Sequence, residues 1–111
     1  MKFRDQRAGK LIREELSKII GKEMEFGDAL PTITDVDVDK KLETAKVMIS
    51  VIPSEKAKEV FDSLSRSKNN LQRILFKKLN MKPMPKIQFE IDRGPEHAAG
   101  VEKILLEEDN S

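Results

Sequence analysis

The sequence predicts an α+β domain in which a three-stranded sheet is covered by helices on one face. Three observations support this class. Apolar residues recur at steps of three and four in three segments, as they do on one side of a helix. In three other segments they alternate with polar residues, as in strands with one wet face. The segments follow one another as helix, strand, strand, helix, helix, strand.

The first helix is expected from Asp5 onward. Its apolar stripe repeats at helical spacing and consists of Ala8, Leu11, Ile12, Leu16, Ile19 and Ile20. We expect this helix to end between Gly21 and Gly27, because glycine weakens a helix.

Two strands are expected next, joined as an antiparallel hairpin. After Pro31, the apolar positions of the first strand alternate with Asp35 and Asp37, and the turn follows at Asp39, Lys40 and Lys41. The second strand has its apolar side at Ala45, Val47, Ile49 and Val51.

A pair of helices is expected after the hairpin. Ser54 is a suitable N-cap for the first, whose inner face is Ala57, Val60, Phe61 and Leu64. The polar stretch 65–70 consists of poor helix formers, so we expect a kink there, with Asn69 or Asn70 in a left-handed backbone conformation. The helical stripe then resumes at Leu71, Ile74, Leu75 and Leu79.

The last part of the chain is expected to hold a third strand and a short helix. Pro83 and Pro85 exclude a helix, and the apolar residues Ile87, Phe89 and Ile91 then alternate with polar ones. A short helix is expected over 96–106 and a flexible acidic tail over 107–111. Residues 1–106 are therefore interpreted as one domain.

Composition excludes several classes of protein. The 111 residues include no cysteine, so disulfides, zinc fingers, iron–sulfur clusters and thiol nucleophiles are excluded. The apolar stretches are too short for a membrane span, and no secretory signal is recognised, so we expect a cytoplasmic protein. His97 is the only histidine, and no Walker or Ser-His-Asp pattern occurs. We therefore expect no enzyme, no cofactor and no metal site.

The charge is unevenly distributed. The net charge is only +1, yet residues 66–86 contain seven basic side chains and no acidic one, between acidic flanks. Such asymmetry is typical of a surface that binds a polyanion, although a solvated lysine-rich surface is the alternative. The candidate RNA-binding residues are Arg66, Lys68, Asn69, Arg73, Lys77, Lys78, Lys82 and Lys86, followed by Arg4, Arg7 and Lys10 on the first helix.

Base stacking is expected to contribute little. The chain has no Trp and no Tyr, and its five Phe residues fall mostly on predicted buried faces. A reader of the RRM type needs exposed aromatic residues on its strands and is disfavoured. We therefore expect recognition of RNA backbone and shape.

The element order is that of the second topological type of KH domain. A KH domain grips nucleic acid with a Gly-x-x-Gly loop between its paired helices. None of the five glycines, Gly9, Gly21, Gly27, Gly94 and Gly100, lies between those helices here. We therefore predict a KH-like fold with a kinked helix pair and without ordinary KH recognition of a single strand.

Several segments resemble the bacterial ribosome-binding factor A family. They are Ile33–Val38, Ala45–Val51 and Met84–Asp92, followed by Glu96 and His97. The resemblance covers nearly the whole chain. It implies a KH-like fold in which an Ala-x-Gly kink replaces the Gly-x-x-Gly loop, and Ser67, Lys68 and Asn69 occupy that place. This chain departs from the Ala-x-Gly pattern but keeps a small first residue.

The same resemblance implies a function. It indicates a cold-shock-associated assembly factor that binds the small ribosomal subunit and its rRNA near the decoding region and promotes late rRNA processing and maturation. We expect a monomer with no membrane contact, and other assembly factors are candidate partners. The alternative is a small regulatory or scaffolding domain that binds a protein through its sheet edge or acidic face.

Overall fold

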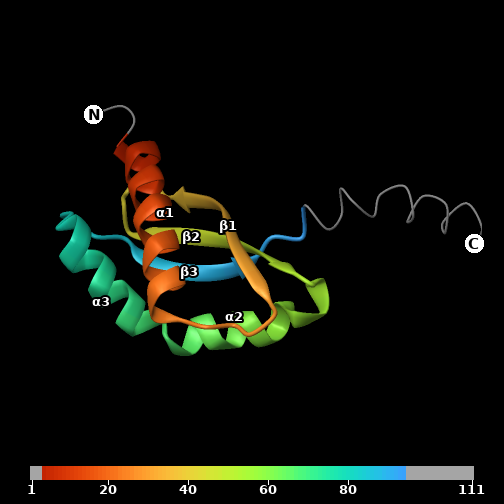
Figure 1. Cartoon of the computed structure of the whole chain (residues 1–111). Helices are drawn as coiled ribbons and strands as arrows, with labels where there is room; N and C mark the ends of the chain where they lie inside the picture. Colours follow the sequence, from red (N-terminus) through yellow and green to blue (C-terminus); the bar gives the residue numbers. More distant parts are fainter. Residues whose placement is uncertain (1–3, 95–111) are drawn as a thin grey trace, which may run out of the picture.

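The computed structural model describes residues 4–94 of the chain (Figure 1). Its elements are α1 (Arg4–Glu23), β1 (Leu30–Val38), β2 (Thr44–Ile52), the 3-10 turn η1 (Ser54–Lys56), α2 (Ala57–Arg66), α3 (Lys68–Leu79) and β3 (Lys86–Ile91). The predicted order of helices and strands is confirmed. The helix expected over 96–106 and the tail expected over 107–111 lie outside the described residues.

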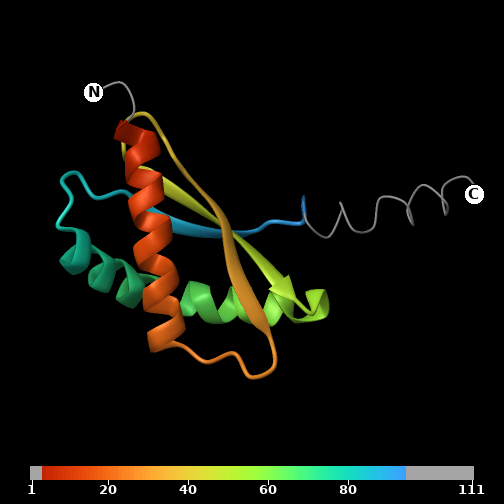
Figure 2. The same ribbon diagram turned by 45° about the horizontal axis from the view of Figure 1, so that its top comes forward.

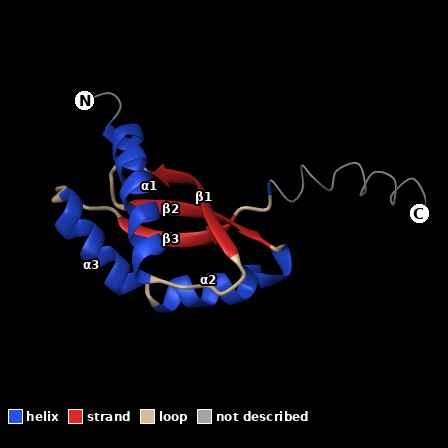
Figure 3. Cartoon of the chain, in the orientation of Figure 1, coloured by secondary structure: helices blue, strands red, loops and turns tan. Residues whose placement is uncertain are grey.

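The three strands form one mixed sheet in the order β1-β2-β3 (Figure 3). The strands β1 and β2 pair antiparallel from Leu30 opposite Ile52 to Val38 opposite Ala45, which confirms the predicted hairpin. The third strand, β3, pairs parallel to β2. The helix pair between β2 and β3 provides the long crossover that a parallel pair requires.

The helices cover one face of the sheet, as predicted (Figures 1 and 2). Alternate strand residues on that face are buried, and they include Ala45, Val47, Ile49, Ile87 and Phe89. They pack with the inner stripe of α1 and with Leu64, Leu71 and Leu75 of the helix pair. The other face carries polar side chains, among them Lys46 and Glu90, whose charged atoms lie 3.6 Å apart.

α1 lies very close to β1 at one point. A Cβ atom added to Gly9 would lie 2.8 Å from the carbonyl oxygen of Val36, closer than real Cβ atoms approach. The missing side chain therefore lets the helix rest against the backbone of the strand.

The joint between α2 and α3 is a single residue, Ser67. Its N–H donates to the carbonyl of Ser63 at 3.2 Å and of Leu64 at 3.1 Å, and its carbonyl accepts from the N–H of Leu71 at 2.9 Å. Because hydrogen bonds continue on both sides, the bend needs no left-handed residue. The prediction of one at Asn69 or Asn70 is wrong, and both lie within α3.

The prediction that Ser54 caps the second helix is also wrong. Ser54 opens the 3-10 turn η1, and α2 begins only at Ala57, with no side-chain capping bond. The N–H of Lys56 donates instead to the carbonyl of Pro53 at 3.0 Å. A backbone carbonyl thus accepts a hydrogen bond just before the helix, as the hydroxyl of a capping serine would at its start.

Asp92 ties the end of β3 to both other strands. Its carboxylate accepts hydrogen bonds from the Thr34 hydroxyl at 2.6 Å and from the Gly94 N–H at 2.8 Å. Its own N–H donates to the carbonyl of Ile49 at 2.7 Å. Because the bond from Thr34, and then that from Gly94, favours the charged form, the pKa of Asp92 lies below its ordinary value of 3.8.

Candidate nucleic-acid interface

The outward side of α3 carries a row of polar and cationic residues. α3 turns Leu71 and Leu75 into the core, so the positions on the opposite side are exposed. They recur at steps of three and four and therefore form one stripe. We call this stripe the α3 outer face, and it consists of Asn69, Asn70, Arg73, Phe76 and Lys77.

The positive charges of this face are not neutralised within residues 4–94. α3 contains no acidic residue, and Arg73, Lys77 and Lys78 form no salt bridge with another described residue. Arg73 donates a hydrogen bond to the amide oxygen of Asn70, at 2.5 Å, which leaves its charge unpaired. These cations are thus available to an anionic ligand.

Gln72 fixes the position of α3 relative to the sheet. Its Nε2 donates to the carbonyl of Pro85 at 2.9 Å, and its Oε1 accepts from the N–H of Ile87 at 2.7 Å. One side chain thereby satisfies two backbone groups where β3 begins. Gln72 was not among the residues predicted from the sequence, where its only signal is a polar side chain directly after Leu71.

Three further predicted residues lie near the α3 outer face. Lys78 is exposed on the flank of α3 across the buried stripe from Gln72. Lys82 is exposed in the loop that leads from α3 to β3, and Lys68 is half-buried in the first turn of α3. They extend the cationic surface at its margins.

Other predicted residues lie elsewhere. Lys86 is exposed on the open face of the sheet, because its neighbour Ile87 points into the core. Lys10 lines a shallow hollow between α1 and β1 together with Asp5, Asp35 and Asp37. Arg66 lines another hollow with Glu25, Asp28 and Glu59. These cations are therefore not part of the α3 outer face, and two of them line hollows that carboxylates also line.

Arg4 and Arg7 are exposed in the first turns of α1. Figures 1 and 2 show this end of α1 on the side of the molecule away from the α2–α3 joint. The eleven candidate residues therefore do not form one continuous patch.

Among the Phe residues in 4–94, which were expected to fall mostly on buried faces, one is exposed. Phe89 is buried and Phe26 and Phe61 are half-buried, but Phe76 is 39% exposed. It lies between Arg73 and Lys77 on the α3 outer face. The sequence indicates this exposure, because Phe76 directly follows Leu75 and therefore lies off the apolar stripe of the helix.

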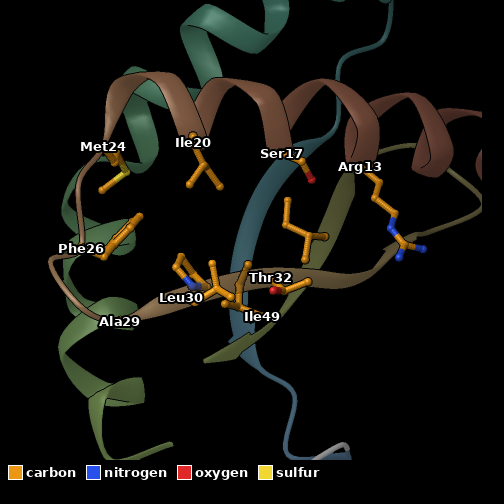
Figure 4. A pocket seen from close by; sticks show the side chains of 12 residues that line it. Arg13, Ser17, Ile20, Met24, Phe26, Ala29, Leu30, Thr32 and Ile49 are labelled. Atoms are coloured by element: carbon orange, nitrogen blue, oxygen red, sulfur yellow. The ribbon is translucent and has the colours of Figure 1, made fainter. Parts of the chain in front are cut away.

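A largely apolar cavity of about 460 Å³ lies between the second half of α1 and β1 (Figure 4). Its walls include Ile20, Met24, Phe26 and Leu30, and Arg13 lies at one end. No sequence pattern predicts this cavity, because it depends on how the helix crosses the strand.

Residues 4–94 lack two other kinds of feature. No group of three or more His, Cys, Asp or Glu side chains is placed there to hold a metal ion. No helix in this part of the chain combines the length and apolar character that crossing a membrane requires.

The fold and the site define a KH-like α+β domain whose helix α3 presents a cationic outer face, with Ser67 at the joint where a KH domain has its glycine loop. The chain belongs to the ribosome-binding factor A family, whose family model matches residues 4–105. It is 33% identical over 110 residues to ribosome-binding factor A of Caldanaerobacter subterraneus subsp. tengcongensis, covering 96% of this chain and 90% of the relative. The relative from Chlorobium phaeobacteroides is also 33% identical over 110 residues, with 96% and 95% covered.

A crystal structure and a fitted homology model of similar fold confirm the architecture. The crystal structure of ribosome-binding factor A from Thermus thermophilus superposes with a TM-score of 0.68 at 20% identity, covering 81% of this chain and 98% of that one. A homology model of the Thermus thermophilus factor, fitted into the cryo-EM map of a 30S complex, superposes with a TM-score of 0.64 at 22% identity. That comparison covers 76% of this chain and 90% of the other. The family resemblance and the KH-like fold expected from the sequence are thus confirmed.

Proposed function

We propose that this protein is an assembly factor that binds the small ribosomal subunit and its rRNA through the α3 outer face, without catalysing a reaction. Family membership supports the ribosome as the target, and a structure of similar fold is described in a 30S complex. The observation that carries the proposal is the helix α3 itself. It presents Arg73 and Lys77, with Lys78 beside them, and has no acidic residue.

The physical basis is the attraction between these cations and RNA phosphates. Each cation that meets a phosphate releases condensed counterions, so affinity falls as salt concentration rises. Arg73 and Lys77 are four residues apart on one face and therefore reach the same stretch of backbone. Gln72 holds α3 on the sheet, so these charges are presented on a fixed support.

We also infer a role for this protein in the assembly of the subunit. The factor would act in the cytoplasm, as a monomer built on residues 1–106, and promote late processing and maturation of the rRNA, including during cold shock. Binding by exposed charges suits this role, because an assembly factor must leave once the subunit is mature.

Reversing the three charges Arg73→Glu, Lys77→Glu and Lys78→Glu together tests the proposal. We expect binding to small ribosomal subunits, measured by co-sedimentation, to weaken about 10- to 100-fold because phosphate contacts become repulsive. The thermal melting temperature should change little, since all three side chains are exposed.

The matched control reverses Lys22, Lys40 and Lys41, which are equally exposed and free of salt bridges within residues 4–94. This control has the same net charge as the α3 variant and should keep the affinity of the wild-type protein for small subunits. Equal losses in both variants would show a general charge effect, and unchanged binding by the α3 variant would reject this surface.

A further inference from the structure

Phe76 is the exposed aromatic residue of the α3 outer face. Among residues 4–94, the large hydrophobic side chains with the most exposure are Leu11, Leu30, Ile52 and Phe76, and Phe76 is the only aromatic one. A single exposed apolar residue is ordinary in a soluble protein. Phe76 differs from such a residue because the exposed cations Arg73 and Lys77 lie on the same helix face.

The neighbours of Phe76 supply the other parts of a nucleotide site. Arg73 lies three residues before it and Lys77 directly after it, and both cations lack a carboxylate partner within residues 4–94. Asn80 lies one turn later, where its left-handed backbone (φ 46°, ψ 43°) ends the helix, and its N–H donates to the carbonyl of Phe76 at 2.7 Å. Asn69 and Asn80 are exposed and offer amide groups at the two ends of the face.

We propose that Phe76 stacks on an unpaired base of the bound RNA while Arg73 and Lys77 hold the adjoining phosphates. The inference rests on the proposed function and adds the class of RNA element: a bulge, loop or single strand. A continuous A-form duplex keeps its bases stacked inside and offers no free face to a phenyl ring. Charge complementarity favours RNA as the occupant, because α3 offers cations and no acid.

The absence of Trp and Tyr makes a direct test possible. Phe76→Trp places the only tryptophan of the chain at the stacking position. The control Ile52→Trp places it at the end of β2, where Ile52 is 65% exposed. The two variants are titrated with a 12-nucleotide oligoadenylate and with a 12-base-pair RNA duplex. We expect oligoadenylate to quench the fluorescence of the Phe76→Trp variant, and the duplex to leave it unchanged. The Ile52→Trp variant should respond to neither RNA.

A second variant separates stacking from charge. Phe76→Leu keeps an apolar side chain but loses the aromatic face, so affinity for oligoadenylate should fall about tenfold with no change in its salt dependence. The double variant Arg73→Gln, Lys77→Gln should instead weaken the salt dependence. The slope of log affinity against log salt concentration should become shallower by about 0.7 for each lost phosphate contact.

The outcomes distinguish this inference from the proposed function. Absence of quenching in the Phe76→Trp variant, or full affinity of Phe76→Leu for oligoadenylate, overturns the stacking inference even when small subunits are still bound. A Phe76→Leu variant that loses subunit binding but keeps oligoadenylate binding overturns it in favour of a ribosomal protein as the partner at this position. Failure of the wild-type protein to bind small subunits overturns the proposed function as well.

Discussion

Gly9 shows how one residue sets the distance between two elements. The sequence suggests only a weak point in a helix, because glycine has low helix propensity. In the fold, the backbone of β1 occupies the space of its missing side chain, and the carbonyl of Val36 would lie 2.8 Å from an added Cβ. Gly21, in the same helix, has nothing within 4 Å of that position.

The two glycines should therefore respond in opposite ways to the same substitution. Gly9→Ala should destabilise the protein by about 1–3 kcal/mol, because a backbone atom cannot move aside cheaply. Gly21→Ala should stabilise it by up to about 1 kcal/mol through helix propensity. Urea denaturation of both variants measures the difference, and equal effects would mean that α1 does not approach β1 as described.

At the scale of the element, Gln72 attaches α3 to the first residues of β3. Replacing it with Ala leaves the carbonyl of Pro85 and the N–H of Ile87 without these partners. We expect Gln72→Ala to lower the free energy of unfolding by about 1–3 kcal/mol. The amide of Ile87 should also exchange its hydrogen faster.

Gln6→Ala is the control for this prediction, because Gln6 is exposed within α1. It should change the stability by less than about 0.5 kcal/mol. A Gln72→Ala variant as stable as this control, with unchanged exchange at Ile87, would show that the two hydrogen bonds do not hold the helix in place.

Most elements could be predicted from the sequence because each has a clear period. The apolar stripe of α1 and the alternation in β1, β2 and β3 are local properties of the chain. The parallel pairing of β3 with β2 could not be predicted, because an alternating pattern does not identify its partner strand. The prediction of a left-handed residue at Asn69 or Asn70 was wrong, since the chain bends at Ser67 with ordinary helical hydrogen bonds.

For the whole molecule, the sequence predicted a polyanion-binding surface from one cationic segment, but it could not show which cations of that segment lie together. Residues 66–86 run through a helix end, a second helix, a loop and the start of a strand, so their side chains point in different directions. The period of α3 places Arg73 and Lys77 outward together, whereas the alternation of β3 places Lys86 on the open face of the sheet. Packing of the chain brings Glu25 and Asp28 to the hollow that Arg66 lines, which no local pattern reveals.

The central claim is that the α3 outer face meets rRNA on the small subunit. The chain has no cysteine, so a single introduced thiol can carry an iron chelate that cleaves nearby RNA. Asn69→Cys places this probe on the α3 outer face, and Gln88→Cys places it on the open face of the sheet. Both positions are exposed.

The decisive measurement is the pattern of rRNA cleavage in complexes of these two labelled variants with small subunits. We predict strong, localised cleavage from position 69 and weak or no cleavage from position 88. Cleavage from position 88 alone, or equal cleavage from both positions, would contradict the assignment of α3 as the surface that contacts RNA.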